Sequence, residues 1–326
     1  LMTANAAAWW DEENNCFMES RKDYADPTRE IAEETGCKFI DENKIVTDAW
    51  NSMSKNRVLS GYFICEPLES KAYPSGTNDT THMKAKGAKR VAKLIADAIP
   101  ENVPELAKYL KGDETFTDIQ GHWAEDVIKT LAENDKVSGV GDGKFNPDGT
   151  VTRAEFLKMA MDSLGIVGHA YRDGECLDAT NDDWYCYYLQ GALDKDIIPK
   201  EMIENCNVTK VTKTLAEATD DKEAVTTDVN VYTGKFDGDK PITREEMAAI
   251  AVRCKNYKMR RLTDWDNERR YPIFSFKDSD EIDEKYISDV VEAYNLNYID
   301  GMEDGRFAPK ENLTRAQAAV VMNNLK

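Results

Sequence analysis

In the second part of the chain, apolar residues recur with the period of an α-helix. At 123–132 and again at 156–164 they recur every three or four residues, which predicts two amphipathic helices in succession. A similar pair of segments recurs at 184–192 and 247–254. A pair of helices this short cannot bury its own apolar face, so we expect several pairs to pack on one another.

Three sets of motifs mark three copies of this helical pair. Each copy has an aspartate preceded by an aromatic residue, then a glycine-containing turn that ends in a phenylalanine, then a Thr-Arg sequence. The aspartates are Asp118, Asp173 and Asp278, the phenylalanines Phe145, Phe236 and Phe307, and the arginines Arg153, Arg244 and Arg315. A repeat of this length predicts a mainly helical architecture in which the copies close on one another.

The second copy contains an insertion. From the aspartate to the arginine there are 35 positions in the first copy and 37 in the third, but 71 in the second. The extra residues fall at roughly 200–233 and are rich in Thr, Asp and Lys. Polar insertions of this kind usually run over the surface, so we expect a surface excursion here.

The residues of each Thr-Arg motif have different roles. The threonine and the residue three positions later (Glu155, Glu246 or Gln317) form the pattern of a capping box that starts a helix. The arginine stands at the first helical position, where the helix dipole disfavours a cation by about 0.3–1 kcal/mol. Three arginines at such unfavourable positions indicate an anion site, because a helix N-terminus and a guanidinium together can bind a carboxylate. The alternative is that each arginine pairs with an acidic residue of a neighbouring copy.

These motifs resemble the S-layer homology (SLH) domain, a repeat that holds bacterial proteins on the cell wall. The resemblance covers residues 115–326. It implies a mainly α, pseudo-threefold trimer of helix–loop–helix repeats, an extracellular place at the bacterial cell surface, and binding of secondary cell-wall polysaccharide. A pyruvylated sugar of that polysaccharide would meet the three arginines. The predicted copies span 115–168, 169–257 and 274–326.

Two tryptophans complete the candidate ligand-binding residues. Trp123 and Trp184 stand at corresponding places in the first and second copies. Indole rings can stack on sugars, which would extend a polysaccharide site. Aromatic residues at helical spacing are, however, usually part of the core.

Residues 1–100 alternate between helix-like and strand-like segments, which predicts an α/β domain. Asp26 and Pro27 have the pattern of a helix start and Gly36 that of its end, and a buried strand follows at 37–41. A last helix carries apolar residues between 88 and 99 on one face. We expect residues 101–114 to form a linker.

Asp79 and His82 stand just before that last helix, at a spacing that suits an orienting acid and a general base. With Gly87 behind them, they resemble the final block of SGNH (GDSL-type) hydrolases, particularly the rhamnogalacturonan acetylesterase-like carbohydrate esterases. The resemblance implies the C-terminal portion of a three-layer α/β domain acting on a polysaccharide ester. The alternative is an exposed loop histidine without catalytic function.

The esterase resemblance lacks a nucleophile. Ser60 and Ser75 are each followed by glycine, but neither stands in a strand–turn–helix elbow. We expect the serine-bearing block to lie upstream of Leu1. Without a nucleophile and oxyanion donors an Asp–His pair cannot transfer acyl groups, so this chain alone is expected to be inactive.

Charge and cysteine usage narrow the range of partners. The formal net charge of -19 excludes a nucleic-acid partner, which requires a basic face. No apolar run reaches the roughly 20 residues of a membrane span, and the residues from Leu1 to Asn5 do not have the pattern of a basic leader followed by an apolar stretch. The seven cysteines show no metal-binding spacing, so neither a metal nor a cofactor is expected. Their scatter is typical of free thiols, although Cys176 and Cys186 could pair.

Three functions remain open from the sequence. The first is a wall-anchored carbohydrate O-acetylesterase of which this chain holds the C-terminal half. The second is a non-catalytic surface protein whose whole function is attachment. The third is an S-layer lattice subunit, which would require long β-rich assembly domains that the sequence does not contain.

Overall fold

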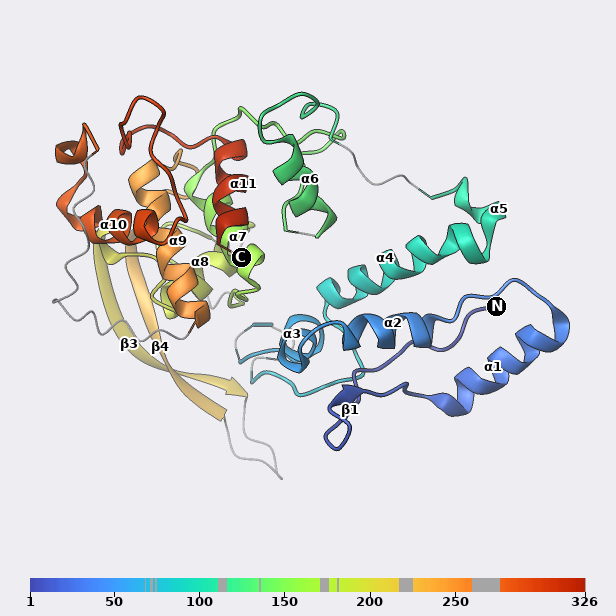
Figure 1. Ribbon diagram of the computed structural model, residues 1–326. Coiled ribbons are helices and arrows are strands. Elements are labelled where there is room, and N and C mark those ends of the chain that lie inside the picture. The colour runs from blue at the N-terminus through green and yellow to red at the C-terminus, as the bar shows by residue number, and fades with distance from the viewer. Residues whose placement is uncertain are drawn as a thin grey trace. The chain divides into compact units, whose positions relative to one another are not determined.

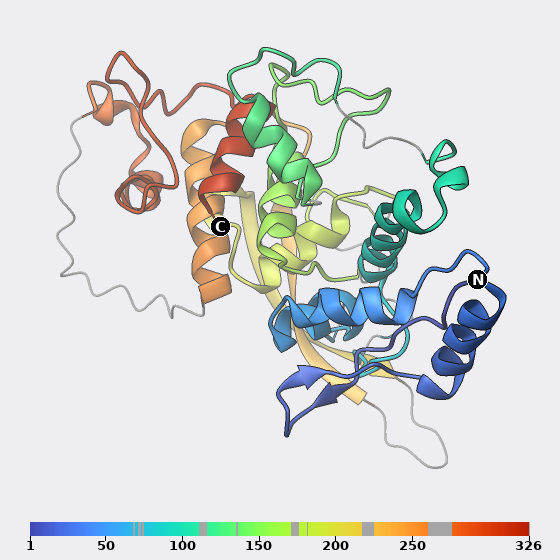
Figure 2. The same ribbon diagram turned by 45° about the vertical axis from the view of Figure 1, so that its right-hand side comes forward.

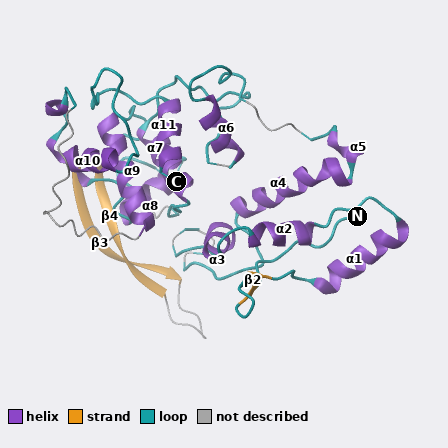
Figure 3. Ribbon diagram, viewed as in Figure 1, coloured by secondary structure: helices purple, strands orange, loops and turns teal. Residues whose placement is uncertain are grey.

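The computed structural model describes residues 1–325 except 68, 71–72, 74, 111–115, 135, 171–175, 181, 217–224 and 260–275. The chain forms two compact units, Leu1–Asp113 and Glu114–Lys326 (Figure 1). Each combines helices with a small two-stranded sheet, as the colouring by secondary structure shows (Figure 3).

The unit Leu1–Asp113 packs its helices around an aromatic core. Its elements are β1 (Trp10–Asp11), β2 (Cys16–Phe17), α1 (Lys22–Thr35), α2 (Glu42–Asn51), α3 (Lys55–Val58), the π-helix Leu59–Phe63, α4 (Ala85–Asn102) and α5 (Pro104–Ala107). Trp50 is fully buried and stacks on Tyr62 with ring centroids 5.1 Å apart. Val91 of α4 reaches the same core. Gly87 lets α4 approach closely, because a Cβ there would lie 2.8 Å from the carbonyl oxygen of Tyr62.

The structure corrects the predicted start of the first helix and the predicted strand at 37–41 of this unit. Helix α1 begins at Lys22, so Pro27 lies inside the helix and does not start it; Gly36 does end it, with φ 64°. The predicted strand at 37–41 makes a single parallel bridge, Met2 to Ile40. The described residues show a mixed unit with little sheet, and the SGNH-type three-layer arrangement stays a prediction.

The unit Glu114–Lys326 is mainly helical. Its elements are α6 (Glu125–Glu133), α7 (Arg153–Leu164), α8 (Cys186–Asp194), the 3-10 helix Lys200–Met202, β3 (Glu204–Ala216), β4 (Val225–Lys235), α9 (Arg244–Met259), the 3-10 turns Ser279–Glu281 and Glu284–Tyr286, α10 (Ile287–Asn295) and α11 (Arg315–Asn324). Helix α7 packs on α8, α9 packs on α10, and α11 packs on α6. The second helix of each pair therefore contacts the first helix of the next pair.

The insertion of the second copy forms a long β-hairpin, not an irregular loop. Strands β3 and β4 pair antiparallel, with Thr209 opposite Val231 (Figure 2). Near its base the hairpin is anchored, because Tyr232 is 4% exposed and its hydroxyl donates to the Leu193 carbonyl oxygen at 3.1 Å.

Candidate functional site

The three Thr-Arg motifs start three helices, as predicted. Each threonine hydroxyl accepts the N–H of the residue three positions later, whose side chain accepts the threonine N–H in return. The pairs are Thr152–Glu155, Thr243–Glu246 and Thr314–Gln317. Each capping box satisfies the N–H of the threonine and of the residue three positions later. The N–H of each arginine donates instead to a backbone carbonyl oxygen of the next copy, from Arg153 to Lys240 (2.9 Å), from Arg244 to Glu311 (3.0 Å) and from Arg315 to Gly149 (2.9 Å). The backbone of each arginine is therefore fixed, and its N–H is already bonded.

Each arginine is buried, between 6% and 8% exposed, and its guanidinium reaches into the next copy. There it donates a hydrogen bond to the carbonyl oxygen of the phenylalanine that ends the turn. The three bonds are Arg153 Nη1 to Phe236 O (2.6 Å), Arg244 Nε to Phe307 O (2.7 Å) and Arg315 Nε to Phe145 O (2.8 Å). The contacts run from the first copy to the second, to the third and back to the first.

The turn that receives each arginine is held by an aspartate. In each copy one carboxylate accepts the N–H of the phenylalanine and of the residue after it, and that next residue has φ near +58°. The three aspartates are Asp118, Asp178 and Asp278. The motif at 171–173, expected to supply the second aspartate, lies outside the described residues.

The sequence analysis assigned Asp173 to this position and missed Asp178, although the spacing to the following tryptophan indicates Asp178. It precedes Trp184 by six positions, close to the five that separate Asp118 from Trp123, whereas Asp173 precedes Trp184 by eleven. Counting from Asp178 to Arg244 gives 66 positions, so the insertion is shorter than the sequence spacing indicated.

The charges beside the three arginines differ. Arg153 forms an ion pair with Glu246, and Arg315 Nη1 lies 3.9 Å from Glu155. Each of these acids is the capping-box residue of the next copy. For Arg244 the corresponding residue is Gln317, which is neutral, and in the described part of the chain Arg244 has no ion pair.

The pKa values follow these surroundings. Burial lowers the pKa of Arg244 and of Arg315. For Arg153 burial acts in the same direction, but the hydrogen bond and charge of Glu246 outweigh it and raise the pKa. Arg244 differs from the other two in having no ion pair among the described residues, although the more distant carboxylates of Glu311, Asp278 and Asp300 partly oppose the effect of its burial.

The two candidate tryptophans lie on the surface. Trp123 is 66% exposed and Trp184 is 53% exposed, so neither belongs to the core. The equivalent residue of the third copy is Lys285, one position before the buried Tyr286. Exposed indole faces at two of three corresponding places are available to a ligand.

Asp79 and His82 form a contact pair in the loop before α4. His82 Nδ1 lies 2.7 Å from Asp79 Oδ2, while Asp79 Oδ1 accepts the backbone N–H of Thr81 (2.7 Å) and His82 (2.9 Å). These backbone bonds, followed by that from the imidazole, lower the pKa of Asp79 to about 2. A carboxylate held in this way fixes the orientation of the imidazole.

A nucleophile is not paired with His82. Its side chain is 85% exposed, and within the described residues of its unit the ring is hydrogen-bonded to Asp79 and to no serine. Ser60, named above, donates instead to the Asn56 carbonyl oxygen at 2.6 Å. Among the described residues of this unit, the arrangement holds an imidazole in a fixed orientation with no serine bonded to it.

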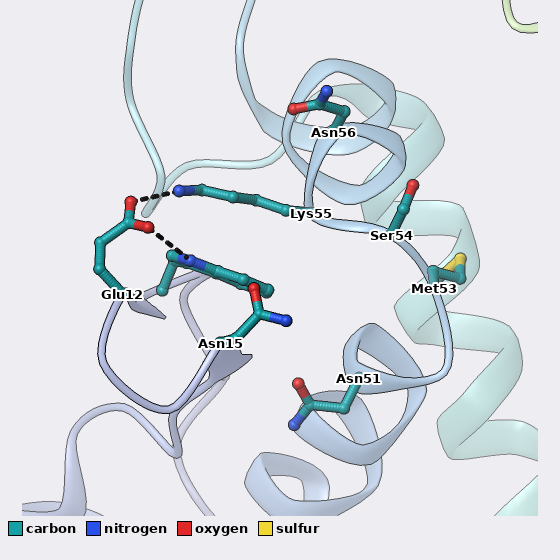
Figure 4. A pocket seen from close by; sticks show the side chains of 8 residues that line it. Glu12, Asn15, Asn51, Met53, Ser54, Lys55 and Asn56 are labelled. Atoms are coloured by element: carbon teal, nitrogen blue, oxygen red, sulfur yellow. Dashed lines mark hydrogen bonds and ion pairs between the residues drawn. The ribbon is translucent and has the colours of Figure 1, made fainter.

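A pocket of about 520 Å³ opens elsewhere on the same unit (Figure 4). Its floor includes Trp10, whose indole N–H donates to Glu12 at 3.2 Å, and Lys55, which pairs with Glu12 and lies over the Trp10 ring. Asn51, another lining residue, uses its amide to bind both backbone groups of Phe17. Several polar groups that line this pocket are thus already bonded to other groups of the protein.

Metal and membrane features were sought over the same described ranges. There, no cluster of three or more His, Cys, Asp or Glu side chains is placed to hold a metal ion. Nor does any described helix have the length and apolar character needed to cross a bilayer.

The S-layer homology domain model matches residues 115–157 and 275–319, within the first and third predicted copies. Amylopullulanase of Thermoanaerobacterium thermosulfurigenes is 34% identical over 213 residues, which is 65% of this chain and 10% of that protein. The cellulosome-anchoring protein of Acetivibrio thermocellus is 33% identical over 103 residues, 30% of this chain and 21% of that protein.

A different kind of relative is rhamnogalacturonan acetylesterase RhgT of Bacillus subtilis. It is 31% identical over 93 residues, which is 28% of this chain and 39% of the relative. The chain thus spans only a small part of the amylopullulanase and of the cellulosome-anchoring protein, and less than half of the esterase. The chain contains two regions that match the S-layer homology domain, is similar in part to a carbohydrate esterase, and is located at the bacterial cell surface.

Proposed function

We propose that the unit Glu114–Lys326 anchors the protein by binding secondary cell-wall polysaccharide through a pyruvyl carboxylate. The observation that carries this proposal is the buried guanidinium of Arg244, which has no carboxylate partner among the described residues. A buried cation without a directly paired carboxylate is costly, and an incoming carboxylate would relieve that cost. Charge-assisted binding by arginine also suits the planar shape of a carboxylate.

The three copies are proposed to share a pseudo-threefold axis. The support is the cyclic order of their contacts, in which every arginine and every second helix meets the next copy. Backbone bridges follow the same order, from Thr152 to Pro241, from Thr243 to Asn312 and from Thr314 to Thr150. Such an arrangement would create three similar grooves that differ in charge.

The three arginines have unequal parts in this proposal. Arg244 is the primary carboxylate-binding residue, Arg315 a weaker one because Glu155 lies 3.9 Å away, and Arg153 is largely satisfied by Glu246. Trp123 and Trp184 would stack on neighbouring sugar rings from their exposed positions.

Titration calorimetry with isolated wall polysaccharide tests the role of Arg244. The Arg244→Ala variant should lose about 1.5–3 kcal/mol of binding free energy, the contribution of a charged hydrogen bond. Arg306→Ala is the matched control, because it removes the same charge from an exposed residue that already pairs with Asp304 and Glu311. Equal affinity of the Arg244→Ala variant and the parent chain would contradict the proposal.

A second proposal concerns the unit Leu1–Asp113, in which Asp79 would orient His82 as the general base of a carbohydrate O-acetylesterase. The 2.7 Å contact and the partial similarity to RhgT support it. The isolated chain is expected to leave acetyl esters intact, because His82 has no serine partner in the described unit. The competing account is a surface protein in which this unit has no catalytic function.

A chimera separates these accounts. The 93-residue segment of RhgT that aligns with this chain is replaced by its counterpart from this chain. Acetylesterase turnover should persist and should fall by about three powers of ten or more on His82→Ala. A folded, active chimera whose turnover does not change with His82→Ala would favour the non-catalytic account.

A further inference from the structure

Cys176 and Cys186 bring two buried thiols together in the second copy. The two residues are free thiols in the structure and are 0% and 2% exposed, and their side chains lie close enough for Cys176 to be hydrogen-bonded to Cys186. Cys186 Sγ also donates to the Thr180 carbonyl oxygen at 2.8 Å, and Ala179 N–H closes a turn onto the Cys176 carbonyl oxygen at 3.0 Å. The turn from 176 to 180 therefore holds both sulfur atoms in one place.

The other two copies carry an aromatic residue where the second has Cys176. Two positions before the aspartates Asp118 and Asp278 stand Phe116 and Phe276. Their rings lie 5.3 Å and 5.4 Å from the rings of the phenylalanines that end the turns in their copies. A cysteine side chain cannot make that ring contact, so the second copy must secure its loop in another way.

Cys186 is placed to secure that loop. It is the first residue of α8, and the first residue of the equivalent helix α6 is Glu125, which binds the Gly121 N–H of the preceding loop at 2.6 Å. A link from this position to the loop is therefore already present in the first copy, as a hydrogen bond. In the second copy the same elements meet through two sulfur atoms.

We infer that Cys176 and Cys186 form a disulfide in the protein at the cell surface. The step is thiol–disulfide exchange with a disulfide-bearing oxidant. The Cys176–Cys186 S–S bond forms, the S–S bond of the oxidant breaks, and its two sulfur atoms take up the two protons and two electrons of the cysteine thiols. The extracellular side of the membrane is where such bonds persist.

The order of folding and oxidation follows from the burial. The hydrogen bond with Cys186 and burial both raise the pKa of the Cys176 thiol, which suppresses the thiolate that attacks a disulfide. The bond therefore forms before the second copy closes. A chain folded in the reduced state should resist later oxidation at this pair.

Disulfide mapping after refolding tests the inference. The denatured chain is refolded with reduced and oxidised glutathione, free thiols are alkylated in denaturant, and the protein is digested with trypsin. The sequence from 173 to 195 contains no internal Lys or Arg, so both cysteines fall in one peptide. That peptide should be two hydrogen atoms lighter than its reduced form and should carry no alkyl group.

The melting temperature provides the second readout. Reduction of the refolded chain should lower it by roughly 5–10 °C, as expected for loss of a small disulfide loop. The Cys176→Ser variant should show no such response, whereas Cys37→Ser, which alters an exposed cysteine, should keep it. Two alkyl groups on the 173–195 peptide of the oxidatively refolded parent chain would overturn the inference.

Discussion

At the scale of single residues, one amide in place of a carboxylate distinguishes the three arginine sites. Glu155 and Glu246 cap α7 and α9 and also face the arginine of the preceding copy, whereas Gln317 caps α11 equally well and leaves Arg244 without an ion pair among the described residues. Glu and Gln are interchangeable in a capping box. They are not interchangeable as partners of a buried cation.

The substitution Gln317→Glu should therefore reduce glycan binding without harming the fold. A carboxylate at 317 would pair with Arg244, compete with the ligand carboxylate, and weaken affinity for wall polysaccharide by roughly tenfold. The free energy of unfolding should stay the same or rise, because the capping box is retained. Calorimetric titration and chemical denaturation measure the two quantities.

The mirror substitution Glu155→Gln provides the control. It removes the carboxylate near Arg315 and should leave binding unchanged or strengthen it. If Gln317→Glu bound the glycan as tightly as the parent chain, Arg244 would not be the carboxylate-binding residue.

Asp79 offers a pH test at the same scale. Its folded pKa of about 2 lies below the roughly 3.9 of an unfolded chain. The stabilisation from its bonds is therefore fully present above about pH 4 and is lost as the pH falls through 2. The carboxyl carbon of Asp79, followed by NMR, should titrate with a midpoint near 2. A midpoint near 4 would show that the Asp79–His82 contact does not persist in solution.

At the scale of elements, helices with clear capping signals could be predicted from sequence. The starts of α7, α9 and α11 were placed correctly because Thr and Glu or Gln determine them locally. The predicted start of α1 was wrong, because the helix begins at Lys22 and contains Pro27 in its interior, even though proline removes one backbone hydrogen bond there. The hairpin β3–β4 was expected only as a polar excursion, although the β-branched Thr and Val residues along both segments favour strands.

Tyr232 tests how that hairpin is attached. Replacing it by Ala should cost about 3–5 kcal/mol of unfolding free energy, since a buried aromatic side chain and its hydrogen bond to Leu193 are lost. Tyr232→Phe should cost about 1–3 kcal/mol, because it leaves the buried Leu193 carbonyl oxygen unpaired. Val211→Ala, at a 38% exposed residue of the same hairpin, should change little. Denaturant unfolding gives all three values, and equal costs for Tyr232→Ala and Val211→Ala would contradict the packing described.

At the scale of the whole molecule, the chain joins a surface-anchoring unit to a unit similar in part to an esterase. The repeat could be recognised from sequence because its motifs recur with nearly constant spacing in the first and third copies. The hydrogen-bond acceptor of each arginine side chain could not be predicted from the sequence, because it lies in another copy. The acceptors are the carbonyl oxygens of Phe236, Phe307 and Phe145. The pairing of Asp79 with His82 could be predicted from their spacing in the sequence. The solvent exposure of His82 could not, because it depends on how the whole unit folds.

Binding of the purified chain to isolated cell walls tests the central claim most directly. The walls are used intact, after chemical removal of the secondary polysaccharide, and after selective removal of its pyruvyl groups. The chain should co-sediment with intact walls and remain in solution with both treated preparations. Equal binding to intact walls and to walls stripped of the polysaccharide would contradict the proposal that this unit anchors the protein through that polymer.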